Sequence, residues 1–475
     1  MIQNFFSEEI LKYFPFEPTS EQSEALGKLS EFMFDRNPDI LFLLKGYAGT
    51  GKSSLVGALV KAMNQLKQKT VLLAPTGRAA KVFSNYAGQG AYTIHKKIYR
   101  QKVFSHEPSG FVQADNLHKH TLFIVDEASM ISNEGLDSAF GTGRLLDDLI
   151  HYVYSGEGCR LILMGDSAQL PPVGQVESPA LDISMLQGYG MDVSDITLTQ
   201  VVRQAEESGI LKNATLLRYA LAKNKVSLFP QVITKGYGDV KIVQGHEMVE
   251  AIEDAYSREG LEETIIITRS NKRANAFNTG IRNRILYREE ELSSGDLLMV
   301  ARNNYFWAEK YEKMDFIANG DLMEVKRVRR TEELYGFRFS DVTVYFPDYD
   351  VEMDIKILLD TLHTDTPSLS REQNNQLFYA VAEDYSDLST KKEIMKRIKV
   401  DPFYNAVHVK YGYAVTGHKA QGGQWKNVFL DLSYISQDHL GIDFYRWLYT
   451  AFTRATENLF LINPVEEILS TEDKQ

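Results

Sequence analysis

The segment Gly46-Tyr47-Ala48-Gly49-Thr50-Gly51-Lys52-Ser53 matches G-x-x-x-x-G-K-[ST], the pattern of a phosphate-binding loop. It follows an apolar run at 40–44 that is typical of a buried strand, and apolar residues recur at helical spacing over 55–63. The glycines therefore fall at a strand-to-helix turn, where backbone N–H groups can surround a triphosphate at a helix N-terminus. A glycine turn that only links a strand to a helix would need neither Lys52 nor Ser53. The pattern predicts a nucleotide site.

The polar groups of this loop have expected partners on ATP. Lys52 should meet the β- and γ-phosphates during catalysis, and the Ser53 hydroxyl should bind the Mg²⁺ that accompanies the nucleotide. The loop residues predicted to contact ATP are Gly46, Ala48, Gly49, Thr50, Gly51, Lys52, Ser53 and Ser54.

Length and composition limit what surrounds the loop. The chain has 475 residues, more than one hydrophobic core usually supports, so we expect roughly two to four domains. Its formal charge of -12 argues against coating of nucleic acid through overall charge, although it leaves room for a locally basic channel. The single cysteine, Cys159, excludes a disulfide framework. With no run of eighteen apolar residues and no secretory leader at the N-terminus, we expect a soluble, cytoplasmic protein without membrane contact.

Further apolar runs alternate with helical segments along the chain. They lie at 71–74, 122–125, 161–164, 264–268, 428–432 and 459–462. This alternation predicts an α/β protein with two parallel sheets covered by helices. Between residues 292 and 405 shorter strand-like runs bounded by turn residues predict a small β-barrel inserted into the second α/β domain, followed by a solvated helical excursion over 360–400. The expected domains are 1–205, then 206–291 with 406–475, and the insertion at 292–405.

Two polar segments follow strands of the first predicted sheet. Asp126 can hold Mg²⁺ through its water shell, while Glu127 can orient or deprotonate the attacking water. A surface acidic pair is the alternative, and the preceding strand argues against it. Gln169, in the segment 165–172 that ends Gln-Leu-Pro-Pro, could sense the γ-phosphate by hydrogen bonding, or the segment could be a plain loop.

Six further segments, in chain order, resemble the motifs of superfamily 1 helicases of the RecD, Dda and petite-integration-frequency (PIF) group, and the resemblance covers nearly the whole chain. The segments are Pro18-Thr19-Ser20-Glu21-Gln22, Pro75-Thr76-Gly77-Arg78-Ala79-Ala80, Thr93-Ile94-His95-Lys96, Leu198-Thr199-Gln200-Val201-Val202-Arg203-Gln204, Thr416-Gly417-His418-Lys419-Ala420-Gln421-Gly422 and Tyr449-Thr450-Ala451-Phe452-Thr453-Arg454-Ala455. The resemblance implies two RecA-like P-loop NTPase domains. It also implies that Gln22 reads adenine and that Arg203 and Arg454 are catalytic arginines; a solvated helix start is the alternative for Gln22. The extra signature that eukaryotic members carry after Glu127 is missing.

The arginines have a physical reason to be there. Phosphoryl transfer spreads negative charge over the γ-phosphate oxygens, and guanidinium groups from outside the loop can stabilise that charge. Because Arg454 lies hundreds of residues from Lys52, contact of both with one ATP would place the nucleotide in a cleft between the two sheets. Hydrolysis would then open and close the cleft and move a bound strand.

Residues at strand ends are the candidates for nucleic-acid contact. Small donors and cations there suit phosphate oxygens, and the resemblance points to the same positions. They are Pro75, Thr76, Gly77, Arg78, His95, Lys96, Asn271, Thr416, His418 and Lys419. His95 and His418 could equally be structural histidines. The resemblance further suggests that the stretch from Tyr86 to His118, which contains Phe104, Pro108 and Phe111, forms a wedge that splits the duplex.

Together these features predict a monomeric ATP- and Mg²⁺-dependent DNA helicase that acts on single-stranded DNA and tailed duplexes. The resemblance implies movement from 5′ to 3′. One alternative is an RNA-directed or non-unwinding translocase. Another is a nucleotide-gated binding scaffold without turnover, against which Glu127, Gln169, Arg203 and Arg454 argue because a scaffold needs no hydrolytic groups.

Overall fold

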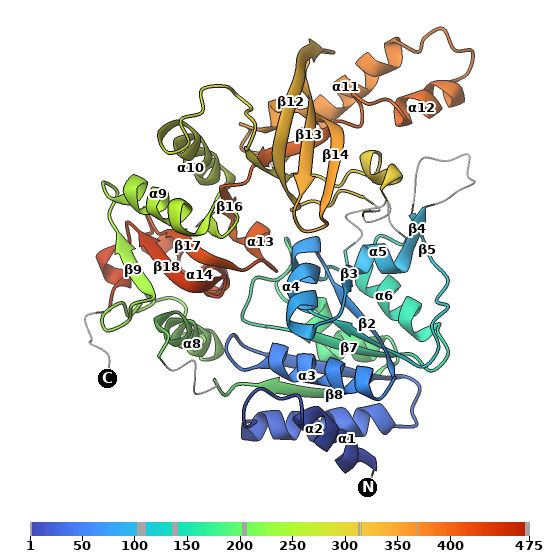
Figure 1. Ribbon diagram of the computed structural model, residues 1–475, viewed down its shortest axis with the longest axis vertical. Helices are drawn as coiled ribbons and strands as arrows, with labels where there is room; N and C mark the ends of the chain where they lie inside the picture. Colours follow the sequence, from blue (N-terminus) through green and yellow to red (C-terminus); the bar gives the residue numbers. More distant parts are fainter. Residues whose placement is uncertain are drawn as a thin grey trace.

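The computed structural model of the protein describes residues 2–101, 111–134, 141–201, 207–311, 314, 316–366 and 368–470. Two parallel sheets stand beside each other, and a barrel lies at the end of the molecule above both (Figure 1). The predicted α/β class, with two RecA-like domains and an inserted barrel, is confirmed.

The first domain is built on a six-stranded sheet in which every neighbouring pair is parallel. Alternate residues of β1 face opposite cores: Ile40, Phe42 and Leu44 on one face, Leu41 and Leu43 on the other. Helices α1 to α4 cover the first face and α5 to α7 the second. In sheet order the strands are β3 (Ala91–Thr93), β2 (Lys69–Ala74), β6 (Thr121–Val125), β7 (Arg160–Gly165), β1 (Ile40–Gly46) and β8 (Asp192–Leu198). The helices are α1 (Ile2–Leu11), α2 (Ser20–Phe34), α3 (Lys52–Gln65), α4 (Gly77–Ala87), α5 (Ile94–Ile98), α6 (Leu145–Tyr154) and α7 (Ile183–Gly188).

A small antiparallel hairpin, β4 (Tyr99–Gln101) with β5 (Phe111–Gln113), projects from this domain inside the predicted wedge. Phe104 and Pro108 lie outside the described residues. The ring of Phe111 packs against Tyr305 of the barrel, with centroids 5.0 Å apart. The strand β5 is therefore held against the inserted domain by aromatic contact at Phe111.

The second domain has a five-stranded parallel sheet. In sheet order its strands are β16 (Ala414–Thr416), β10 (Thr264–Thr268), β17 (Trp425–Asp431), β18 (Ala455–Ile462) and β9 (Val240–Val243). The accompanying helices are α8 (Gly209–Ala222), α9 (Met248–Glu259), α10 (Asn271–Arg284), α13 (Gly417–Ala420) and α14 (Ile442–Phe452). In the described part of the chain, no helix combines the length and apolar character needed to cross a membrane.

The barrel is closed by five strands, of which only the pair β14 and β15 is parallel. Its last strand lies at 407–411, beyond the expected boundary at 405, so the barrel takes a strand from the segment that leads back into the second domain. The elements are β11 (Leu297–Val300), β12 (Leu322–Leu334), β13 (Phe337–Phe346), β14 (Val351–Leu358), α11 (Arg371–Glu383), α12 (Lys391–Lys399) and β15 (Val407–Tyr411).

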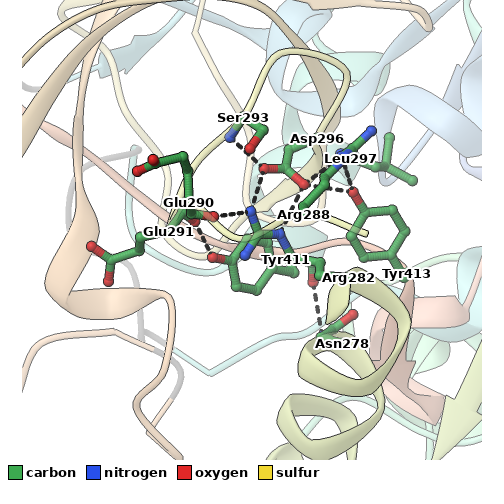
Figure 2. A network of polar contacts seen from close by, with 10 residues as sticks. All are labelled: Asn278, Arg282, Arg288, Glu290, Glu291, Ser293, Asp296, Leu297, Tyr411 and Tyr413. Carbon is green, nitrogen blue, oxygen red and sulfur yellow. Dashed lines mark hydrogen bonds and ion pairs between the residues drawn. The ribbon is translucent and has the colours of Figure 1, made fainter. Parts of the chain in front are cut away.

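The barrel and the second domain share one continuous hydrophobic core. A buried polar network fixes the junction between them (Figure 2). Asp296, which is fully buried, accepts hydrogen bonds from Arg282 of α10, from Arg288 and from Tyr413. Because these groups come from the helix, the linker and the segment after β15, the junction ties the barrel to the second domain rather than to the first.

Candidate nucleotide site

The phosphate loop has the backbone shape that the sequence predicts. It joins β1 to α3, and Gly49 and Gly51 have φ of 74° and 80°, values that favour glycine. The Lys52 ammonium donates to the carbonyl oxygens of Gly46 and Tyr47 at 2.5 and 3.0 Å. These bonds hold the cation across the mouth of the loop, where phosphate oxygens would approach.

Gln22 is completely buried rather than solvated. Its side chain completes a capping box with Thr19, whose backbone N–H donates to the amide oxygen at 2.9 Å. Its Nε2 donates to the Thr50 carbonyl of the phosphate loop at 2.9 Å. The amide oxygen thus caps the start of α2, and the amide nitrogen supports the phosphate loop. Gln22 lies behind the loop rather than on the cavity wall.

The acidic pair lies at the carboxyl end of β6, facing the loop. Asp126 accepts from the Tyr86 hydroxyl at 2.6 Å and from the Glu127 backbone at 2.7 Å. Burial, together with the charge of Glu127, raises the pKa of the Asp126 carboxyl. Glu127 has φ of 51°, a left-handed conformation that turns its side chain away from the strand direction.

Arg454 reaches this acidic pair from the second domain. It is 4% exposed, and its guanidinium lies 3.6 Å from the Glu127 carboxylate. Its nitrogens also donate to the carbonyls of Thr450 and Gly423, each at 3.2 Å. The cation is therefore held at the domain boundary by its own domain and paired with an acid of the other. Arg203 lies outside the described residues.

One cavity of about 430 Å³ collects most of the predicted groups. Its walls come from both domains: the phosphate loop, α4, the ends of β6 and β7, and the segments 422–424 and 453–455. The predicted residues on its walls are Ala48, Gly49, Gly51, Lys52, Ser53, Asp126, Glu127, Gln169 and Arg454. Gly46, Thr50 and Ser54 belong to the same loop but are not on these walls.

Gln169 also faces this cavity with an unused acceptor. It is 7% exposed, and its amide oxygen has no hydrogen-bond partner within the protein. An unpartnered buried acceptor carries a desolvation cost, which contact with a hydrated ligand would remove.

Several residues on these walls, or in contact with the segments that form them, were not singled out from the sequence. Tyr86 follows no recognisable pattern, although it contacts Asp126. Tyr449 and Thr450 lie in the segment 449–455, in which the sequence analysis assigned a role only to Arg454. Their contacts with the first domain depend on how the two sheets face each other, which no local pattern encodes.

None of the candidate nucleic-acid residues is on the walls of this cavity, although Arg78 contacts the wall residue Gln424. Pro75 to Arg78 follow β2 and His95 and Lys96 follow β3, whereas Asn271 follows β10 and Thr416 to Lys419 follow β16. β3 and β2 form one end of the first sheet, and β16 and β10 form one end of the second. The predicted strand contacts of both domains therefore lie beyond the cavity walls, at the same end of each sheet as the strands that they follow.

Some of these residues already have partners. Thr76 caps α4 by accepting from the Ala79 backbone at 3.2 Å. Arg78 crosses to the second domain, where it donates to the Gln424 carbonyl at 2.9 Å and lies 4.3 Å from the centre of the Trp425 ring. Burial lowers the pKa of Lys419 to about 8.

His95 lies among aromatic rings, 5.7 Å from Tyr99 and 5.9 Å from Phe316. These contacts favour the structural role that the sequence left open for His95 beside a role in strand contact. His418, in contrast, is exposed.

The barrel also touches the first domain beside these strand ends. Lys81 of α4 lies 3.4 Å from the Asp348 carboxylate, and a Cβ at Gly77 would come within 2.2 Å of the Tyr349 hydroxyl. Only glycine fits there without movement of the tyrosine. The turn between β13 and β14 therefore crosses over the start of α4.

Two family models match separate parts of the chain. A family model described as an AAA domain matches residues 19–229, and one described as a UvrD-like helicase C-terminal domain matches residues 411–462. An uncharacterised protein of Acanthamoeba polyphaga mimivirus is 24% identical over 93% of this chain and 98% of its own length.

Two named helicases match over shorter stretches. The ATP-dependent RecD2 DNA helicase of Deinococcus radiodurans is 32% identical over 41% of this chain, and the ATP-dependent DNA helicase dda of Enterobacteria phage T4 is 25% identical over 54%. The matches span 23% and 55% of those proteins. A solved Pif1 helicase from Bacteroides in complex with ADP-AlF3 and ssDNA aligns with 96% of this chain and 95% of its own, at 14% identity and a TM-score of 0.46. On the two family models and the helicase relatives, the chain belongs to the superfamily 1 helicases of the RecD, Dda and PIF group.

Proposed function

We propose that this protein is an ATP-dependent DNA helicase that moves along single-stranded DNA from 5′ to 3′ and unwinds the duplex ahead of it. The observation that carries the proposal is the single cavity whose walls hold Lys52, Glu127 and Gln169 from one domain and Arg454 from the other. A site shared in this way makes nucleotide binding and domain closure one event.

The side chains divide the work of hydrolysis. Lys52 binds the β- and γ-phosphate oxygens, and Glu127 orients the attacking water and receives its proton. Arg454 stabilises the charge that develops on the γ-phosphate. Among the described residues no group of three or more acidic, histidine or cysteine side chains could hold a metal ion by itself. The donor set fits Mg²⁺ carried by the nucleotide, with Ser53 and Asp126 as its protein partners, where it would neutralise phosphate charge.

We infer movement on DNA from the placement of the candidate strand contacts on both domains. The candidate strand contacts come from both sheets, so closure of the cavity changes the distance between two groups of phosphate-binding residues. A strand gripped alternately by the two domains advances with each cycle. The turn that carries Asp348 contacts Lys81 of α4, so a strand bound at these residues would pass beneath the barrel.

A strand-displacement experiment tests the proposal. Duplexes with a 5′ tail, a 3′ tail or an RNA tail are mixed with the protein, ATP and Mg²⁺, with Glu127→Gln as the matched inactive control. We expect unwinding of the 5′-tailed DNA duplex, little unwinding of the 3′-tailed one, and phosphate release that DNA stimulates. Preference for the RNA tail would indicate an RNA-directed enzyme, and tight nucleotide binding without turnover would indicate a scaffold.

A further inference from the structure

Tyr449 places a hydroxyl from the second domain directly on the phosphate loop. It lies in α14 and is fully buried. The backbone N–H of Ala48, a loop residue, donates to this hydroxyl at 2.9 Å. The two residues are 401 positions apart, so the contact exists only when the domains are together.

The same hydroxyl donates to Asp166 at 2.6 Å. Asp166 follows β7, is 2% exposed, and accepts a second bond from the Ala168 backbone at 2.9 Å. Burial raises the pKa of Tyr449 well above its usual range, so the hydroxyl keeps the proton that it donates. One side chain therefore bridges the phosphate loop and the segment that leads to Gln169.

Two neighbouring contacts bind that segment to the second domain. The Leu170 backbone N–H donates to the Thr450 hydroxyl at 2.9 Å, and Gln421 donates to the Leu170 carbonyl at 2.6 Å. Residues 166–170 are thus held at both ends by the second domain. Tyr449 is the member of this set that also contacts the loop.

We propose that Tyr449 is a positioning residue through which closure of the second domain sets the conformation of the phosphate loop and of Asp166 for hydrolysis. The inference deepens the proposed function and rests on it. When the domains separate, the Ala48 amide and the Asp166 carboxylate lose their shared partner, and two buried polar groups become free to change conformation. In the proposed function DNA binds both domains and draws them together, so Tyr449 would link DNA binding to the rate of hydrolysis.

The test is Tyr449→Phe in the full chain, which removes the hydroxyl and keeps the ring. We expect the DNA-stimulated kcat to fall about tenfold or more, because a positioning bond to a charged partner is lost. The dissociation constant of a fluorescent ATP analogue without DNA should change less than threefold. The dissociation constant for oligo(dT) should also stay within threefold of the wild-type value.

Tyr445→Phe is the matched control. Tyr445 lies in the same helix, is 2% exposed, and donates to the Leu228 carbonyl at 2.8 Å, away from the cavity. Its variant loses a comparable buried hydrogen bond and should keep kcat within twofold of the wild type. An equal fall of kcat in both variants, or a Tyr449→Phe kcat within twofold of the wild type, would overturn the role.

The wild-type measurement separates this inference from the proposed function. If DNA does not stimulate hydrolysis by the wild type, the proposed function fails. The role of Tyr449 is then decided by kcat without DNA: a fall in Tyr449→Phe but not in Tyr445→Phe supports loop positioning, and no fall refutes it.

Discussion

Replacing Asp296 by alanine should destabilise the junction between the barrel and the second domain. The loss should exceed that from breaking an exposed ion pair of the barrel. Asp296 has no exposed surface and accepts from Arg282 at 3.0 Å through both carboxylate oxygens. Arg288, Tyr413 and the Ser293 backbone also donate to it (Figure 2). The alanine variant would leave the Arg282 guanidinium, whose side chain is 5% exposed, without its anion.

The size of the effect follows from that uncompensated charge. Removing one partner of a buried ion pair costs about 3–5 kcal/mol, because the remaining charge keeps its desolvation penalty. At about 2 °C per kcal/mol for a unit of this size, the loss corresponds to a melting temperature lower by about 6–10 °C. The two arginines make hydrogen bonds elsewhere in the network, so the cost should lie within this range rather than above it.

Thermal melting followed by circular dichroism measures the change, and limited proteolysis shows whether the linker at 285–296 is the segment that opens. The control is Asp354→Ala, which breaks an ion pair with Arg329 whose side chains are 58% and 48% exposed. An exposed pair contributes about 0–1 kcal/mol, so this variant should melt within about 2 °C of the wild type. A melting temperature of Asp296→Ala equal to that of Asp354→Ala would refute the reasoning.

Three further predictions concern the nucleotide site and the barrel. Glu127→Gln should retain binding of a fluorescent ATP analogue while the DNA-stimulated kcat falls by about a hundredfold or more; an equal loss of nucleotide affinity would remove its role. Arg454→Ala should lower kcat by about a thousandfold, far more than it weakens nucleotide binding, because its charge acts on the transition state; an unchanged kcat would place it outside the reaction. Burial raises the pKa of Asp321 to about 7, above its unfolded value, so its contribution to stability is present at low pH and is lost as the pH rises toward 7. Asp321→Asn should therefore gain about 1–3 kcal/mol relative to the wild type between pH 5 and pH 8 in urea denaturation, and a difference that does not change with pH would contradict this.

The parts of the fold that the sequence predicted are those set by local chemistry. The phosphate loop needs its glycines because two of them have positive φ, and its strand and helix have periods that can be recognised in one stretch of chain. The short strands of the barrel were also recognisable, but β15 was not assigned to it. At 407–411 its residues are buried on both faces, so it resembles a strand of a parallel sheet, and its pairing with β11 and β14 depends on chain closure.

The contacts that were not predicted are those between separate elements of the fold, within one domain or across two. Gln22 was expected at the adenine or in solvent, yet its amide is used by Thr19 and Thr50, because the cap of α2 lies directly behind the loop. Likewise Arg78 was expected to face a phosphate and lies against Trp425. In each case the residue type fits more than one partner, and only the position of a distant element decides between them.

The pairing of Arg454 with Glu127 shows how the placement of one domain against the other can control the proposed reaction. The guanidinium and the carboxylate lie 3.6 Å apart at the boundary of the domains, and in this pairing each obstructs the task that we propose for the other. Glu127 accepts a proton from water only when its lone pairs are free, and Arg454 stabilises the γ-phosphate only when it faces that group. A γ-phosphate in the cavity carries more negative charge than one carboxylate, so it can draw the arginine away and release the acid in the same movement. Hydrolysis would then begin only when both the nucleotide and the second domain are in place, and this dependence prevents ATP from being consumed while the domains are apart.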